Sequence, residues 1–165
     1  MEMGEKAMVR ARAIRGVLAA GAFLSALCSP GAAHATSFTV ETTSVDLTND
    51  GLCSLREAIQ ASNTLAPVNG LDDCPAGTGD DTILLPPGTY TSSVTLTVSH
   101  KIQIVAAENA SNTIIKTSSG FAASQLLSVT AGGNLSLNSV TLQRGGGVQT
   151  RGIYGSNARI SLSRS

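Results

Sequence analysis

The chain contains very few aromatic residues. Its 165 positions include no tryptophan, two tyrosines and three phenylalanines. Stacking platforms for single-stranded nucleic acids are built from such side chains. An aromatic platform for a carbohydrate would likewise have few side chains available here. Long apolar runs are also missing, since a membrane-spanning helix needs about twenty consecutive apolar residues. The sequence therefore argues against an aromatic stacking site and against a membrane span.

The N-terminal residues 1–35 have the layout of a secretory signal peptide. Arg10, Arg12 and Arg15 form a basic head, residues 16–27 are apolar, and Ala33-His34-Ala35 gives a small-x-small cleavage site. The sequence predicts that this leader is removed and that the mature chain begins at Thr36. A secreted or cell-surface location follows from this prediction.

No charge of one sign dominates the chain. It holds 11 basic and 11 acidic residues, and removal of the leader would leave a net charge near minus two. Non-specific nucleic-acid binding needs a clustered basic surface. We therefore predict no nucleic-acid partner.

Two cysteines remain once the leader is removed, Cys53 and Cys74. Because secreted proteins mature in an oxidising compartment, the natural expectation is a disulfide between them. The alternative is metal binding by thiolates, which would need a histidine or a third cysteine nearby, and the sequence offers neither. By closing the loop between these two cysteines, the disulfide would stabilise the fold by roughly 3 kcal/mol.

Residues 53–59 predict the start of a helix. Ser54 and Glu57 stand three positions apart as Ser-x-x-Glu, which predicts a capping box in which each side chain bonds the backbone amide of the other residue. A helix should begin at Leu55 and present Leu55 and Ile59 on an apolar face. Asn63 is the expected stop, since asparagine tolerates the left-handed conformation that ends helices.

The segment from Phe38 to Tyr90 resembles the CSLREA domain. The resemblance is carried by FTV, DLTNDGLCSLREAIQASN, a second cysteine and DDTILLPPGTY, in that order. In that family the domain lies near the N-terminus of secreted and surface bacterial proteins and commonly precedes a right-handed parallel β-helix. The resemblance thus implies a cap over residues 36–81 with one short α-helix, followed by β-helix coils over residues 82–165.

Short aliphatic segments fill the chain from Thr82 onward. They alternate aliphatic and small polar residues between turn-forming Gly, Asn, Ser and Pro, as half-buried strands do. The expected strands centre on residues 83–85, 94–98, 102–104, 113–115, 127–129, 135–137 and 160–162.

Two of these segments recur 25 positions later: 102–104 as 127–129, and 135–137 as 160–162. A fixed period of this size predicts an all-β solenoid of about three coils, whose first coil is covered by the helix. The alternative is an antiparallel sandwich. Because the chain stops in mid-repeat at Ser165, we expect a fragment of a longer protein or another cover at that end.

Several polar residues are candidates for chemistry. A calcium loop is partly matched by four residues, Asp46, Thr48, Asp50 and Glu57. The alternative is that these residues form only a turn and the helix cap. An acidic cluster lies between the helix and the first repeat strand and is expected to be a solvated turn; it comprises Asp72, Asp73, Asp80 and Asp81. His100 has no obvious orienting partner and is expected in a turn. A glycine-rich loop with Arg144 and Arg151 is a candidate for contact with an acidic polysaccharide.

The sequence favours a non-catalytic secreted or surface module with a structural or adhesive role, without a cofactor or metal, whose partner is a surface glycan or another protein. The alternative is a polysaccharide lyase or hydrolase of the β-helix type. Such an enzyme needs carboxylates beside Lys or Arg on one strand face, whereas Lys101, Lys116, Arg144 and Arg151 have no acid nearby in the sequence. A β-helix fold does not by itself establish an enzymatic function.

Overall fold

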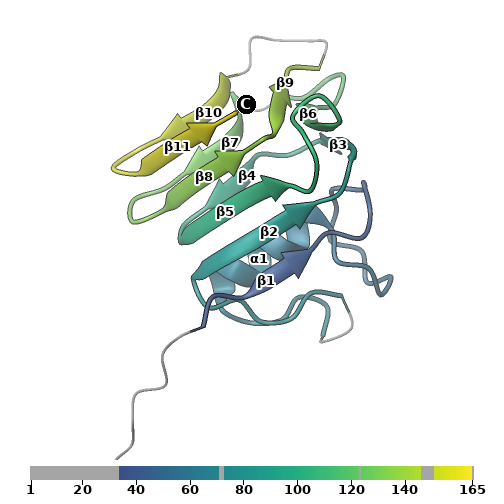
Figure 1. The fold of residues 1–165 in the computed structure, drawn as a ribbon, viewed down its shortest axis with the longest axis vertical. Coiled ribbons are helices and arrows are strands. Elements are labelled where there is room, and N and C mark those ends of the chain that lie inside the picture. The colour runs from purple at the N-terminus through teal and green to yellow at the C-terminus, as the bar shows by residue number, and fades with distance from the viewer. Residues whose placement is uncertain (1–33, 71–72, 123, 146–150, 165) are drawn as a thin grey trace, which may run out of the picture. The chain divides into compact units, whose positions relative to one another are not determined.

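A computed structural model of the chain describes residues 34–70, 73–122, 124–145 and 151–164. The expected leader lies outside these residues except for His34 and Ala35. The described chain is mostly β, with parallel strands in sheets and one helix (Figure 1). No helix within these ranges is long and apolar enough to span a membrane.

The helix α1 spans Leu55–Thr64, between the first two strands. The strands are β1 Ser37–Thr39, β2 Asp80–Leu85, β3 Gly88–Ser92, β4 Leu96–Val98, β5 Lys101–Ala106, β6 Thr113–Thr117, β7 Gln125–Val129, β8 Asn134–Asn138, β9 Thr141–Gln143, β10 Arg151–Gly155 and β11 Arg159–Ser163.

The strands form three sheets in which neighbours are far apart in the sequence. The largest has the order β1-β2-β5-β8-β11, and the others have the orders β10-β7-β4 and β3-β6-β9 (Figure 1). Each ladder between these strands is parallel. A parallel ladder cannot be closed by a tight hairpin, so the chain passes through α1 between β1 and β2, and through the other two sheets before each later return. The antiparallel sandwich alternative is therefore wrong.

One of the two recurrences found in the sequence is a true strand pairing. Leu135 of β8 lies in register with Ile160 of β11. The other recurrence is wrong, because Ile102 of β5 pairs with Leu135 and not with Leu127. Leu127 belongs to β7, which pairs with β4 and β10 in a different sheet. A similar aliphatic pattern on two faces of the fold produced the false match.

A row of apolar side chains runs across the largest sheet. Phe38, Ile83, Ile104, Leu137 and Leu162 are successive register partners. The steps along this row are 45, 21, 33 and 25 residues, so the expected fixed period is also wrong. The first four side chains are buried, whereas Leu162 on β11 is 57% exposed. Burying one such side chain stabilises a fold by about 1.5–3 kcal/mol.

The capping box predicted from the sequence is present at the start of α1. Ser54 Oγ accepts a hydrogen bond from the Glu57 amide at 3.2 Å, and Glu57 Oε2 accepts one from the Ser54 amide at 2.9 Å. Glu57 is fully buried, and its Oε1 accepts a bond from Asn69 Nδ2 at 2.8 Å. Burial raises the pKa of Glu57, with the bonds from Ser54 opposing that shift.

The predicted end of the helix is wrong. Asn63 lies inside α1, and the left-handed residue that follows the helix is Leu65, with φ of 55°. The Asn63 side chain instead bonds the backbone of a distant segment. Its Nδ2 donates to the Thr97 carbonyl at 2.7 Å, and its Oδ1 accepts from the Ser99 amide at 2.9 Å. These bonds tie α1 to the strand β4, and this contact replaces the expected turn.

The buried face of α1 covers one end of the sheets. It includes Leu55, Ala58 and Ile59, as the spacing indicated, and packs against β2 and β4 (Figure 1). Cys53, directly before the cap, is disulfide-bonded to Cys74, with the two Cα atoms 4.9 Å apart. The disulfide thus joins the start of the helix to the loop that leads into β2.

Replacing Ser54 with alanine should lower the free energy of unfolding by about 1.5 kcal/mol, because the Glu57 amide loses its acceptor. Ser54 Oγ also donates to the Asp46 carbonyl at 2.8 Å, which places the expected cost in the upper half of the usual range of about 0.5–2 kcal/mol. Urea unfolding followed by circular dichroism measures the change. Thr64→Ala, at the other end of α1, is the control, and an equal cost for both variants would contradict the capping role.

Candidate functional site

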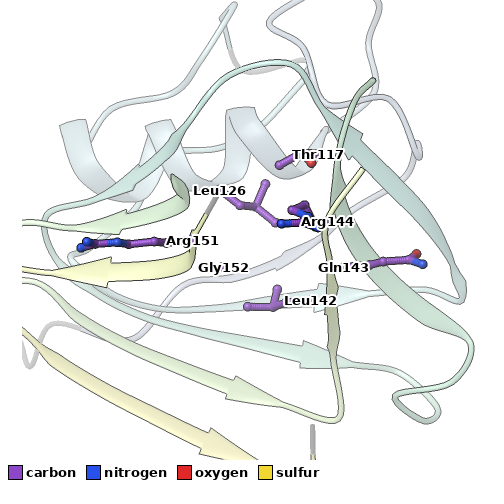
Figure 2. A pocket seen from close by; sticks show the side chains of 7 residues that line it. All are labelled: Thr117, Leu126, Leu142, Gln143, Arg144, Arg151 and Gly152. Atoms are coloured by element: carbon purple, nitrogen blue, oxygen red, sulfur yellow. The ribbon is translucent and has the colours of Figure 1, made fainter. Parts of the chain in front are cut away.

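A pocket of about 160 Å³ lies where β6, β7, β9 and β10 meet (Figure 2). Leu126 is buried and forms apolar lining, together with the half-buried Leu142. The polar lining comes from several elements and comprises Thr117, Gln143, Arg144 and Arg151, with Gly152 beside them. The pocket thus combines an apolar wall with exposed hydrogen-bond donors.

The close approach of the segment after β9 to β6 depends on a glycine. The Gly145 amide donates to Thr117 Oγ1 at 2.7 Å. A Cβ at this position would overlap the Thr117 carbonyl oxygen, so no larger side chain fits. Gly145 therefore lets Arg144 enter the lining. Gly146 and Gly147, the rest of the predicted glycine-rich loop, lie outside the described residues.

The two arginines take different positions around the pocket. In Figure 2 Arg144 is drawn near Thr117 and Leu126, whereas the side chain of Arg151 extends away from the other labelled residues. Both side chains are exposed. Guanidinium groups carry five donors in a planar fork that matches carboxylate and sulfate oxygens. The arrangement suits an anionic group at Arg144 with further negative charge toward Arg151.

No protein family, curated protein or solved structure matches the chain. The chemistry of the pocket must therefore be judged from its own residues and from the charges around it.

Charge is segregated along the chain, which the overall count did not reveal. Residues 109–165 hold five basic residues and no acidic one; the basic residues are Lys116, Arg144, Arg151, Arg159 and Arg164. All the acidic residues therefore precede this stretch. The net charge of the whole chain is zero because the acidic excess of residues 1–108 cancels the basic excess of residues 109–165. The net charge of each segment reveals the basic part. A basic stretch of this kind attracts anionic partners.

The residues of the candidate calcium loop serve other purposes. Asp46 Oδ2 accepts a hydrogen bond from Ser44 Oγ at 2.5 Å, a bond that holds the pKa of Asp46 below its ordinary value. Asp50 Oδ1 accepts from the Leu52 amide at 3.0 Å. Both oxygens of Glu57 are taken by Ser54 and Asn69. In the described residues, no group of three or more His, Cys, Asp or Glu side chains is arranged to hold a metal.

The expectation of a solvated acidic loop is wrong for two of its members. Asp73 and Asp81 are buried. Asp73 Oδ1 accepts from the Gly51 amide at 2.7 Å, and its buried Oδ2 has no hydrogen-bond partner among the described residues. Asp80 is exposed, and Asp72 lies outside the described residues. Burial of both carboxylates shows that Asp73 and Asp81 are packed into the fold.

The statement that Lys101 has no acid nearby also changes, whereas His100 lies in a bend as expected. Lys101 does have an acid nearby, since its Nζ lies 2.7 Å from Asp80 Oδ2 on the neighbouring strand. The two residues are far apart in the sequence but are register neighbours across a parallel ladder, so the sequence alone does not predict this ion pair. His100 lies in the bend between β4 and β5, with its Nδ1 3.2 Å from Ser99 Oγ, while that same hydroxyl lies 3.0 Å from Asn63 Oδ1. The Ser99 hydroxyl donates its proton to Asn63 Oδ1 and not to a general base, which does not favour an activated nucleophile.

Proposed function

We propose that the chain is a non-catalytic, secreted or cell-surface module of bacterial origin that adheres to anionic glycans through the pocket lined by Arg144 and Arg151. In this proposal residues 36–81 form a cap of the CSLREA type, and residues 82–165 form coils of a right-handed parallel β-helix. The observation that supports the adhesive role is the pocket itself. Its two arginines lie within residues 109–165, which contain five basic residues and no acidic one.

The parallel ladders support the β-helix assignment. From β2 onward, each sheet adds a strand only after the chain has passed through the other two sheets, as in β2, β5, β8 and β11. Strand crossovers of this kind are right-handed in nearly all known cases. The helix α1 packs against β2 and against β4, which is an edge strand of its sheet, and would hinder edge-to-edge association at β4.

Glycan binding should depend on the two pocket arginines. We expect the double variant Arg144→Ala/Arg151→Ala to lose about tenfold or more in affinity for oligogalacturonates or sulfated oligosaccharides, because a charge-assisted hydrogen bond contributes about 1.5–3 kcal/mol. Binding of the unaltered chain should also weaken as salt is raised. Isothermal titration calorimetry with charged and neutral oligosaccharides of equal length measures both effects.

The double variant Arg159→Ala/Arg164→Ala is the matched control for this experiment. It removes two positive charges from the same basic stretch, as the pocket variant does, but neither arginine lines the pocket. Its expected effect on affinity is less than about threefold, since only long-range attraction is lost. Equal losses in both variants, or equal binding of neutral sugars, would reject the pocket as the binding site.

The enzyme alternative has one observation in its favour, the exposed ion pair between Lys101 and Asp80 on two neighbouring strands. Glycoside hydrolysis needs two carboxylates on either side of a sugar, about 5–9.5 Å apart. The adjacent carboxylate of Asp81 is buried and bound by backbone and hydroxyl donors. A uronate-release assay on pectins and alginates tests this alternative, and product formation that Lys101→Ala abolishes would support it.

The exposed last strand supports the alternative that these coils belong to a longer surface protein. All five residues of β11 are exposed, including Ile160 and Leu162. Their register partners on β8, Leu135 and Leu137, are fully buried. A further coil stacked on β11 would bury this aliphatic pair in the same way.

A further inference from the structure

The carboxylate of Asp81 is the most heavily bonded buried group in the cap. Asp81 is 1% exposed at the second position of β2. Ser62 Oγ on α1 donates to its Oδ2. The loop before β2 supplies the Thr78 amide at 3.0 Å, the Thr78 hydroxyl at 2.7 Å and the Gly79 amide at 3.0 Å. Four donors from two elements thus surround one carboxylate.

Asp81 nevertheless lacks a countercharge. Among the described residues the one ion pair joins Lys101 to Asp80, and neither of these contributes a bond to Asp81. Fully buried aspartates are rare unless they are paired. Burial alone would raise the pKa of Asp81, but the bonds from Ser62, Thr78 and Gly79 outweigh burial and hold the pKa below its ordinary value. The carboxylate is therefore charged at neutral pH, in a place where a cation would stabilise it.

The remaining donor to Asp81 is the backbone nitrogen of Thr36. This nitrogen lies 3.1 Å from Asp81 Oδ1 and 3.3 Å from Thr78 Oγ1. The Thr36 carbonyl accepts from the Thr82 amide at 2.9 Å, which holds the residue in line with β1 and β2. Ala35 and His34, directly before it, are exposed. Thr36 is the residue at which the mature chain is expected to begin.

We propose that removal of the leader at the Ala35–Thr36 bond creates an α-ammonium group that forms an ion pair with the buried carboxylate of Asp81. A signal peptidase hydrolyses this bond: the C–N bond breaks, the oxygen of water becomes an oxygen of the new Ala35 carboxylate, and the two protons of that water go to the Thr36 nitrogen, which becomes an ammonium. The nitrogen already occupies the position in which the new charge is needed. The proposal rests on the proposed secretion of the chain.

The ion pair makes the stability of the mature cap depend on pH. An opposite charge raises the pKa of an amine, whose ordinary value at a chain terminus is about 7.7–8.0. The stabilisation is therefore complete below about pH 8 and is lost as the pH rises through the raised pKa of the folded state. Before processing, the Thr36 nitrogen is an amide and contributes no such dependence.

Other charged groups near the site are the same in both forms of the chain. Asp80 and Lys101 are exposed and paired with each other. The His100 ring lies against Gly79, where a Cβ would be 2.9 Å from its Cδ2 atom. A comparison of two chains that differ only at their first residue therefore isolates the N-terminal charge.

The test uses two chains, one beginning at Thr36 and one with Ala35 retained, so that Thr36 N is an amide in the second. NMR titration of the terminal amine should give a pKa clearly above the ordinary range for the Thr36 chain and an ordinary value for the Ala35 chain. The Thr36 chain should also have the higher Tm at neutral pH, and this difference should disappear above the raised pKa. Asp81→Asn in both chains should abolish the difference, and the Ala35 comparison remains informative if that variant does not fold.

N-terminal sequencing of the chain after bacterial export separates two kinds of failure. A mature terminus other than Thr36, or no cleavage, overturns the inference at its first step, and absence of export also overturns the proposed location. A terminus at Thr36 with an ordinary amine pKa and no difference in Tm overturns the ion pair alone and leaves the proposed secretion intact.

Discussion

Replacing Leu137 with alanine is expected to lower the free energy of unfolding by about 2–5 kcal/mol. Leu137 is fully buried in the apolar row of the largest sheet, between Ile104 on one side and Leu162 on the other. Truncation removes its own contacts and leaves a cavity beside both neighbours, and parallel strands fixed on either side leave little room for collapse. Urea denaturation monitored by circular dichroism measures the change.

Leu162→Ala is a matched control, because it makes the same substitution at the register partner of Leu137. Leu162 is 57% exposed, so the expected cost is below about 1 kcal/mol. A large cost at both positions would show that another surface covers β11 in solution. A small cost at both would contradict the stacked row as the core of the fold.

Removal of the disulfide is the second change with a large expected effect. The double variant Cys53→Ser/Cys74→Ser should lose roughly 3 kcal/mol of stability, since the two cysteines are 21 residues apart and the open loop gains entropy in the unfolded chain. Both cysteines are buried, so unfavourable burial of two hydroxyls adds to the loss. Thermal unfolding of the oxidised chain and of the double variant gives the difference.

The same comparison under reducing conditions is the control. Reduction of the unaltered chain should bring its Tm down toward that of the double variant, whereas the variant should not respond. A chain whose Tm is unchanged by reduction would contradict a stabilising role for the disulfide.

The sequence predicted best those features that depend on neighbouring residues. The capping box needs only Ser54 and Glu57 at a spacing of three. Strands with alternating aliphatic residues, such as β5 and β8, were also found. The strands that were missed lack this signal: β3 has one large apolar residue, Tyr90, among threonines, β9 has three residues, and β10 contains two glycines.

Features that depend on distant segments could not be read from the sequence. The pairing of β5 with β8 was hidden because the intervening turn of chain is longer than its neighbours. Asp81 looked like a solvated loop residue because its partners come from α1, from the loop at Thr78 and from Thr36. The sequence points to both arginines of the pocket but not to the pocket itself, because its lining is brought together from four strands.

The parallel ladders described above also bear on how the chain folds. Ile83 and Ile104 are among the closest ladder partners in the sequence, and they are still 21 residues apart, so a long loop must close before any sheet gains a strand. Chains dominated by such distant contacts fold slowly. The helix α1 is the one element of the described chain stabilised by local hydrogen bonds, and it lies near the N-terminal end of the described residues. Each later strand can then be added to an edge that is already ordered, which favours growth from the N-terminal end toward β11.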